Sequence, residues 1–274
     1  MKRVAVIGCG WFGFPLAKAL IASGTDVIGT KTTEEGLQQL RDAGIDAVLL
    51  NLGHEDATAQ LHSILADVSA LVVNIPPGLR RGENDYLDKL KLLLEPIKQS
   101  QLKKLVYISS TGAYPQTQGW LTEADLAAAE PGSSSWVLQQ AEQLMQSLRH
   151  DNLAVTTVRF AGLVGAGRNP GRFLAGKTDL PNGDNLVNLV HLEDCITAVR
   201  KILHSQQRST TYNLVSPAHV RRDQFYTQAA ASLGLPPPQF LASNQGDGKV
   251  VVGDLICSEL DFSYQYRDAK ALLN

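Results

Sequence analysis

The feature that most constrains this chain is a glycine pattern near its amino terminus, Gly8-Cys-Gly10-Trp-Phe-Gly13. It follows directly on an apolar β-branched run at residues 4–7 and leads into an amphipathic stretch. This spacing between a strand and a helix is typical of a Rossmann-type dinucleotide-binding unit. The first glycine makes the tight turn, the second lets the backbone approach a pyrophosphate, and the third lets helix and strand pack closely. Glycines that serve only a tight turn are the alternative.

Beyond this loop, apolar β-branched runs alternate with amphipathic stretches, as parallel strands covered by helices do. We expect strands at residues 4–7, 26–30, 47–50, 70–75, 104–109 and 155–160, and helices at 15–23, 34–43, 58–66, 86–99 and 135–149. Right-handed crossovers between such strands give a doubly wound parallel α/β sheet. Residues 1–160 are therefore predicted to form a Rossmann domain that binds NAD(P).

After residue 160 the alternation of apolar runs and amphipathic stretches becomes irregular. Residues 162–184 are rich in glycine, asparagine and proline, and we expect a long irregular excursion there. A helix at 193–204, a strand at 211–215 and a helix at 222–233 are expected to follow. Residues 161–274 are thus predicted to be a mixed segment, part rejoining the main sheet and part forming a small substrate lobe.

Composition and net charge indicate which classes of binding partner and which cellular compartment to expect. The formal net charge of −2 gives no electrostatic reason to expect nucleic acid or a membrane surface. The three cysteines are scattered without metal-ligand spacing, so we expect a reducing compartment and no metal. The apolar run after the basic start is short and interrupted by glycine, which argues against a signal peptide. We therefore expect a cytoplasmic protein.

The end of the second strand bears on the choice of cofactor. NAD enzymes typically place an acidic residue about 20 residues beyond the glycines, where it bonds the ribose 2′-hydroxyl. Here no carboxylate occurs before Glu34, and Lys31 lies among threonines that suit a 2′-phosphate. We predict NADP as cofactor, with NAD as the alternative if Lys31 is merely a solvated lysine. The predicted cofactor contacts are Gly8, Gly10, Trp11, Phe12, Gly13, Thr30, Lys31 and Thr32.

Three further segments resemble a known family, in the family's order and over most of the chain. They are Lys104-Leu-Val-Tyr-Ile-Ser-Ser-Thr-Gly-Ala-Tyr114, Arg159-Phe-Ala-Gly-Leu-Val-Gly-Ala-Gly-Arg168 and Leu189-Val-His-Leu-Glu-Asp194. The chain resembles the extended and atypical short-chain dehydrogenases/reductases, the NAD-dependent epimerase/dehydratase family. In active members a serine or threonine after the fifth strand lies beside a Tyr-xxx-Lys helix. The resemblance implies that the tyrosine moves the proton, while the lysine lowers its pKa and holds the nicotinamide ribose.

The chain departs from this pattern at the catalytic helix, which reads Ser133-Ser-Ser-Trp136-Val-Leu-Gln-Gln140. Trp136 stands at the tyrosine position and Gln140 at the lysine position. An indole does not ionise usefully, and a neutral amide cannot shift a neighbour's pKa as a cation does. We therefore expect the usual mechanism to be missing. A separate Tyr-xxx-Lys, at Tyr266 and Lys270, lies in the tail and is read as coincidence.

The remaining candidates follow from position and chemistry. Ser110 and Thr111 come at the carboxyl end of the fifth strand and are predicted to orient a substrate oxygen, with ordinary turn chemistry as the alternative. Tyr114 is the nearest residue that could replace the missing tyrosine as a proton donor or acceptor, and a packing role is the alternative. The predicted substrate contacts are Arg168, Arg172 and His191. The arginines suit an anionic substrate, with a solvated loop as the alternative, and a structural role is the alternative for the histidine.

Two functions remain open at this point. The first is an NADP-dependent oxidoreductase or epimerase-like enzyme acting on a small hydroxy or keto compound or a nucleotide-sugar-like substrate. The second is a non-catalytic dinucleotide-binding redox sensor or scaffold, and loss of cofactor binding is a third and smaller alternative. If the chain forms a homodimer, we expect helices 86–99 and 135–149 at the interface.

Overall fold

The computed structural model describes residues 3–79, 82–206, 210–242, 246 and 248–273. The chain divides into two compact units, each made of several segments. Unit 1 contains Met1–Ala113, Ala129–Val158 and Ala198–Thr211, and unit 2 contains Tyr114–Ala128, Arg159–Thr197 and Tyr212–Asn274. The chain thus crosses between the units five times, and the division into residues 1–160 and 161–274 stays a prediction.

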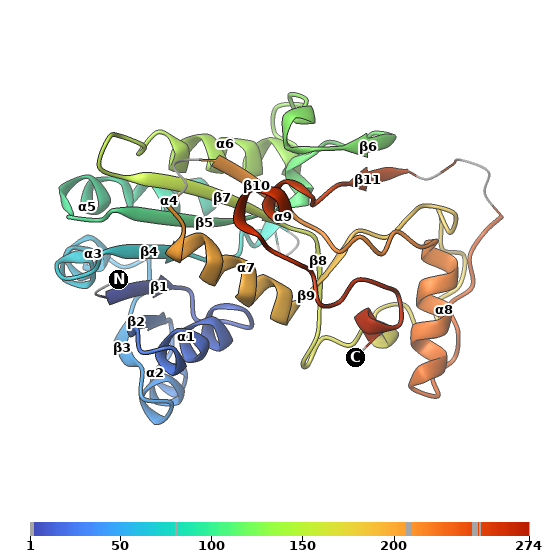
Figure 1. Ribbon diagram of the computed structural model, residues 1–274, viewed down its shortest axis with the longest axis horizontal. Helices are drawn as coiled ribbons and strands as arrows, with labels where there is room; N and C mark the ends of the chain where they lie inside the picture. Colours follow the sequence, from blue (N-terminus) through green and yellow to red (C-terminus); the bar gives the residue numbers. More distant parts are fainter. Residues whose placement is uncertain (1–2, 80–81, 207–209, 243–245, 247, 274) are drawn as a thin grey trace. The chain divides into compact units, whose positions relative to one another are not determined.

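A seven-stranded sheet in the order β10-β7-β5-β4-β1-β2-β3 is built mainly from unit 1 (Figure 1). Its strands are β1 (Arg3–Ile7), β2 (Asp26–Lys31), β3 (Asp46–Leu49), β4 (Ala70–Val73), β5 (Lys104–Ser110), β7 (Ala154–Phe160) and β10 (Thr210–Leu214). The pairings of β1 with β2 and β4, of β2 with β3, and of β4 with β5 are all parallel. The strand order reverses between β1 and β4, so the predicted doubly wound Rossmann-type sheet is confirmed.

The helices between these strands lie close to the predicted positions. They are α1 (Gly13–Ala22), α2 (Glu34–Asp42), α3 (Ala57–Leu65), α4 (Tyr86–Lys91), α5 (Leu94–Gln99), α6 (Ser134–Gln146) and α7 (Leu192–His204). The prediction of one helix over residues 86–99 was wrong, because two shorter helices, α4 and α5, occupy this stretch. Pro96 explains the break, since proline has no N–H to donate to the Leu92 carbonyl and its ring crowds that oxygen.

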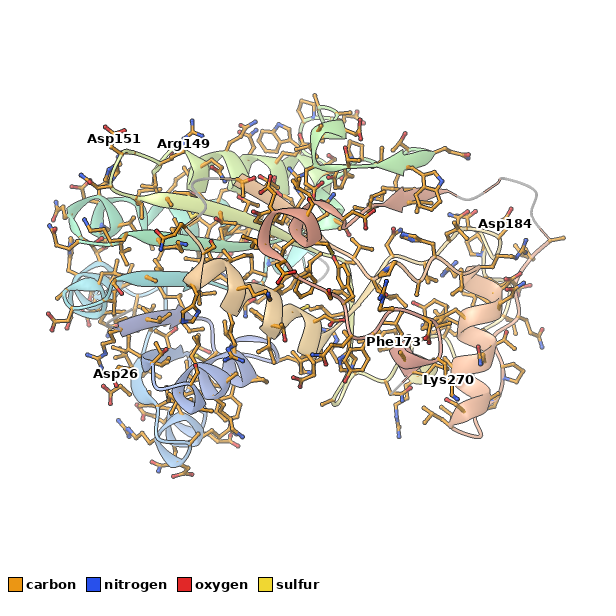
Figure 2. All side chains as sticks on the ribbon, in the orientation of Figure 1. Asp26, Arg149, Asp151, Phe173, Asp184 and Lys270 are labelled. Carbon is orange, nitrogen blue, oxygen red and sulfur yellow. The ribbon has the colours of Figure 1, made fainter. Side chains whose placement is uncertain are left out.

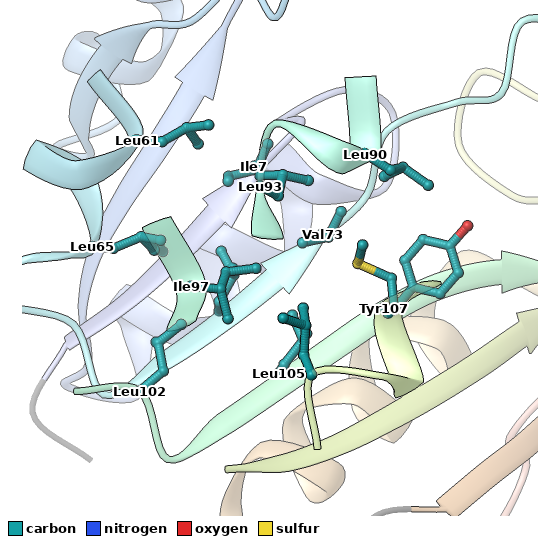
Figure 3. Close-up of a cluster of buried hydrophobic side chains, with 14 of the residues drawn as sticks. Ile7, Leu61, Leu65, Val73, Leu90, Leu93, Ile97, Leu102, Leu105 and Tyr107 are labelled. Atoms are coloured by element: carbon teal, nitrogen blue, oxygen red, sulfur yellow. The ribbon is translucent and has the colours of Figure 1, made fainter. Parts of the chain in front are cut away.

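A large buried apolar cluster of unit 1 lies on the face of the sheet that α3–α6 cover (Figure 3). Alternate residues of each strand point to this face, because side chains in a strand alternate between its two sides. The cluster therefore includes Ile7, Val73, Leu105 and Tyr107 from the strands, packed with Leu61, Leu65, Leu90, Leu93, Ile97 and Leu102. This packing fixes the carboxyl ends of β1, β4 and β5, where an open α/β sheet binds its ligands.

Unit 2 has a smaller core and short ladders between distant segments. Strand β6 (Gly119–Leu121) pairs in parallel with β11 (Lys249–Val251), and β8 (Gly162–Val164) pairs in parallel with β9 (Leu189–His191). Helices α8 (Arg222–Ser232) and α9 (Leu255–Leu260) complete the unit. Its buried apolar cluster gathers Val164, Val187, Leu189, Ala218, Phe225 and Leu272. Within the described part of the chain, no helix has the length and apolar character that crossing a membrane requires.

Candidate functional site

The glycine loop, residues 8–13, joins β1 to α1 in unit 1. Gly8 has φ +95, and a Cβ there would collide with the Asn74 carbonyl oxygen, so this position needs glycine. Its N–H donates to the Thr30 hydroxyl at 3.0 Å, and its carbonyl accepts from the Asn74 amide at 3.0 Å. A Cβ at Gly13 would collide with the Gly8 carbonyl oxygen. These two glycines therefore fit the turn and the helix–strand contact expected of a GxGxxG loop.

Gly10 differs from its two neighbours in the pattern. A Cβ at Gly10 would meet no protein atom within 4 Å, and the residue is not in the left-handed region. Neither backbone strain nor protein packing therefore requires glycine at this position. Phe12 is 3% exposed, so the loop offers a ligand its main chain rather than this ring, whereas Trp11 is partly exposed.

The residues at the end of β2 have separate roles. The Thr30 side chain is buried and holds the loop through the N–H of Gly8. Thr32 is exposed, and Thr33 caps α2 by accepting a hydrogen bond from the Gly36 N–H at 3.2 Å. Lys31 is partly buried, with its ammonium group 5.8 Å from the centroid of the Phe14 ring. The predicted cation thus lies beside the first turn of α1 in unit 1.

Asn74 is a site residue that the sequence analysis missed. It follows β4 directly and holds the Gly8 carbonyl with its side chain, while its own N–H donates to the Ile7 carbonyl at 2.9 Å. A polar residue at the end of the buried run Ala-Leu-Val-Val was the available signal. Asn74 therefore ties the glycine loop to the neighbouring strand.

Ser110 and Thr111 lie where β5 ends, as expected from the sequence. The Ser110 hydroxyl accepts a hydrogen bond from the Gly112 N–H at 3.0 Å, which is ordinary turn chemistry. Thr111 is buried in a short 3₁₀ turn, Thr111–Ala113. The preceding residue, Ser109, donates to the buried carboxylate of Glu142 on α6 at 2.6 Å. A role for Ser110 or Thr111 in orienting substrate remains a prediction.

Helix α6 contacts this turn through a residue other than Trp136 and Gln140, which stand at the tyrosine and lysine positions of the family pattern. Ser133 caps the helix by accepting from the Trp136 N–H at 3.1 Å, and Trp136 is partly exposed. Gln140 bonds only along the helix surface, to Gln143 at 3.2 Å. Its neighbour Gln139 is buried; it donates to the Ala113 carbonyl at 2.9 Å and accepts from the Ala129 N–H at 3.1 Å. Gln139 is therefore the glutamine that contacts the end of the β5 turn.

Tyr114 belongs to unit 2 and is 1% exposed. Its hydroxyl lies 2.8 Å from the Thr122 carbonyl and 2.9 Å from the Asn213 side-chain oxygen, and it accepts from the Arg159 guanidinium at 2.9 Å. Burial raises the pKa of Tyr114, although the positive charge of Arg159 opposes that rise. These are the contacts of a packed tyrosine, and a catalytic role for it stays a prediction.

Arg159 is the cation that accompanies Tyr114, and the sequence analysis did not assign it this role. It is buried, and its guanidinium also lies 4.9 Å from the centroid of the Tyr114 ring. A charged residue inside the otherwise apolar end of β7 was the available signal, because a buried charge needs specific partners.

His191 is buried in unit 2 and stacks on Tyr266, with centroids 3.4 Å apart. Its Nδ1 accepts from the Glu193 N–H at 3.2 Å, and burial lowers its pKa. Tyr266 is therefore a stacking partner in the tail segment. Lys270, which is labelled in Figure 2, lies in the same segment. Arg168 and Arg172 are exposed on the excursion, which Asn169 anchors by donating to the Leu273 carbonyl at 3.3 Å.

Among the residues with described positions, no group of three or more histidine, cysteine, aspartate or glutamate side chains is placed to hold a metal ion. The glycine loop, by contrast, has the strand-to-helix geometry and exposed main chain that a dinucleotide pyrophosphate requires. The residues present therefore fit a dinucleotide cofactor.

Comparison with known proteins gives consistent results. The NAD(P)H-binding family model matches residues 8–195. The chain is 41% identical to protein YeeZ of Escherichia coli strain K12 over 273 residues, covering 98% of this chain and 97% of that one. Its fold is similar to MoeE5 in complex with UDP-glucose and NAD, with a TM-score of 0.78 at 21% identity, covering 99% and 96% of the two chains. It is also similar to UDP-glucuronic acid 4-epimerase from Bacillus cereus in complex with UDP-glucuronic acid and NAD, with a TM-score of 0.78 at 18% identity and coverage of 99% and 96%.

Proposed function

Since this chain belongs to the NAD(P)H-binding family and its fold is similar to that of a nucleotide-sugar epimerase, we propose that it is an NADP-dependent oxidoreductase or epimerase-like enzyme. Its substrate would be a small hydroxy or keto compound, or a nucleotide-sugar-like molecule. The two structural neighbours bind UDP-sugars, which supports the second class of substrate for this chain.

The observation that carries the proposal is Gly10. Gly8 and Gly13 are required by the protein's own backbone, but Gly10 is not. A glycine loses more conformational entropy on folding than any other residue, so its presence in an open position needs another reason. Close approach of a pyrophosphate to the main chain supplies that reason, and the N–H groups at the start of α1 supply the attraction.

The preference for NADP rests on the end of β2. Residues 30–33 contain no carboxylate, which would repel a 2′-phosphate and bond a 2′-hydroxyl. Lys31 supplies a positive charge there. The ammonium group would favour the phosphorylated ribose because a phosphate monoester carries about 1.5 to 2 negative charges at neutral pH.

For the chemical step, the bound nicotinamide would supply or accept a hydride. Ser110 and Thr111 would orient the substrate oxygen, since they end the strand at whose carboxyl edge ligands bind in this fold. A water molecule or Tyr114 would move the proton. Arg168 and Arg172 would meet an anionic group of the substrate, because guanidinium groups bind carboxylates and phosphates in bidentate fashion.

Calorimetric titration of the cofactor-free protein with NADP, NADPH, NAD and NADH tests the binding part of this proposal. We expect the phosphorylated pair to bind more tightly, and we expect Lys31→Glu to abolish the difference while NAD binding is retained. Absence of binding by all four nucleotides would refute the proposal. Equal binding of the phosphorylated and unphosphorylated pairs would refute the NADP preference alone.

A second function is favoured by one observation, the presence of Trp136 and Gln140 where the resembling family has tyrosine and lysine. Without that pair the chain would be a non-catalytic redox sensor or scaffold that responds to cofactor state. Incubation of the NADPH-loaded protein with a panel of carbonyl compounds and sugar nucleotides separates the two functions. Oxidation of NADPH above the protein-free rate supports the enzyme, and its absence across the panel supports the sensor.

A further inference from the structure

Two ammonium groups lie beside one aromatic ring in unit 1. Phe14 is in the first turn of α1, and Lys18 follows it one turn later on the same helix. The Nζ atoms of Lys18 and Lys31 each lie 5.8 Å from the centroid of the Phe14 ring. Because both distances are measured from the same point, the two positive charges cannot be farther apart than twice that length.

Neither charge is neutralised within the part of the chain that the structure describes. No ion pair or hydrogen bond joins either ammonium group to another described residue. The acidic residues nearest to Lys31 along the chain, Glu34 and Glu35, open α2 with exposed side chains and pair with neither lysine. Asp26, the acidic residue nearest to Lys18 along the chain, is also exposed and pairs with neither. Two like charges are thus held near one ring without a protein anion between them.

The chain also makes room for one of these side chains. A Cβ at Gly36 would lie 2.9 Å from Cδ of Lys31, closer than real Cβ atoms come, and 3.1 Å from its Cγ, which is a tight contact. The absence of a side chain at Gly36 therefore lets the lysine stem lie across the first turn of α2. The face of the Phe14 ring attracts both ammonium groups, which offsets part of their mutual repulsion.

We propose that Lys18 is a second specificity-determining residue of the cofactor site, acting with Lys31 on the 2′-phosphate of NADP. This inference rests on the proposed function, which assigns the phosphate to Lys31 alone. A dianion satisfies two neighbouring cations better than one, and it relieves their repulsion when it binds. Phe14 acts in this arrangement as the platform that keeps both ammonium groups at the adenosine end of the glycine loop.

The two lysines should contribute unequally. Lys31 is partly buried and held along its stem, whereas Lys18 is exposed on the helix surface. We expect Lys18→Met to weaken NADP binding by about 2- to 5-fold, as the loss of an exposed ion pair does. Lys18→Glu should weaken it further, since it adds repulsion, and Lys18→Arg should retain most of the affinity. NAD binding should be unchanged in all three variants.

The experiment is a calorimetric titration of wild type and variants with NADP and with NAD at low and at high salt. The loss in Lys18→Met should shrink at high salt, because exposed charges are screened there. Lys98→Met, which removes an exposed lysine on α5, is the matched control and should change neither affinity.

The outcomes separate this inference from the proposal beneath it. If Lys31→Met lowers NADP affinity but neither Lys18→Met nor Lys18→Glu does, the role of Lys18 is refuted and the proposed function stands. If wild type binds NADP and NAD equally and Lys31→Met has no effect, the NADP preference itself fails. Equal losses of NADP and NAD in Lys18→Met would mark a general effect on the loop and would also refute the inference.

Discussion

The clearest test of the glycine loop is a comparison of Gly10→Ala with Gly13→Ala. Each change adds one methyl group, three residues apart in the same loop. At Gly13 the added Cβ would collide with the Gly8 carbonyl oxygen and would lie 3.3 Å from the Asn74 amide nitrogen. At Gly10 it would meet no protein atom within 4 Å. The two variants therefore separate what the fold needs from what a ligand needs.

The expected magnitudes follow from these contacts. Overpacking against fixed backbone costs about 1–3 kcal/mol, so Gly13→Ala should lower the melting temperature by about 3–10 °C. Gly10→Ala loses no contact and reduces the freedom of the unfolded chain, which is worth about 0.4–1 kcal/mol. Its melting temperature should be unchanged or raised slightly. In the complex, however, the same methyl group would press on the pyrophosphate, and a cost of about 1–3 kcal/mol corresponds to roughly 5- to 150-fold weaker binding.

Thermal unfolding without cofactor and calorimetric titration with NADP measure the two quantities separately. The predicted pattern is a stable Gly10→Ala protein that has lost affinity and a destabilised Gly13→Ala protein. Wild-type affinity in Gly10→Ala would show that no phosphate approaches this main chain, and the argument from an unneeded glycine would fail. Destabilisation of Gly10→Ala as large as that of Gly13→Ala would refute the contact analysis.

Three further predictions concern buried or partly buried polar groups. Lys104 donates to the Ile202 carbonyl at 2.9 Å near the end of α7. Lys104→Met should therefore destabilise the protein by about 1–3 kcal/mol and speed amide hydrogen exchange in the last turn of that helix. Unchanged exchange there would contradict this. Ser109→Ala removes a donor to the buried Glu142 carboxylate and should cost about 1–3 kcal/mol in chemical unfolding; a cost below about 0.5 kcal/mol would show that the carboxylate does not depend on this bond. Burial raises the pKa of the Asp194 carboxyl above 3.8, so this group binds a proton more tightly in the folded than in the unfolded state. The stability that results is fully present below pH 3.8 and is lost as the pH rises through the raised pKa. Asp194→Asn should lack this pH-dependent component, and parallel unfolding free energies for wild type and variant across the acidic range would refute it.

Much of unit 1 could be predicted from the sequence because its signals are local. The strand at 26–30 and the helix at 34–43, for example, became β2 (Asp26–Lys31) and α2 (Glu34–Asp42). Each buried strand is a continuous apolar run, and each helix shows its own period. The split at residues 92–93 was also within reach, since Pro96 forbids the helical bond that a continuous helix needs.

The short ladders of unit 2 could not be predicted in the same way. Strand β6 (Gly119–Leu121) is only three residues long and pairs with residues 249–251, far along the chain. Three residues show no period, and nothing local specifies so distant a partner. The contacts of Tyr114 are equally non-local, because they join it to Arg159 and Asn213. The sequence identified Tyr114 as a candidate site residue but did not predict which residues its hydroxyl contacts.

The two hydrogen bonds of Gln139 have a consequence for how this chain can change over time. Ala113 and Ala129 are the last and first unit 1 residues on either side of segment 114–128, and a single amide side chain holds both. The closed base fixes the two ends of the segment, and Tyr114 within it also contacts Arg159 on β7 and Asn213 on β10. The entropic cost of closing a loop grows only slowly, by about 0.6 kcal/mol for each doubling of length. Length changes in residues 115–118, which connect Tyr114 to β6 and are largely exposed, should therefore cost the Rossmann unit little, and this connection is where related chains can diverge without refolding the cofactor site.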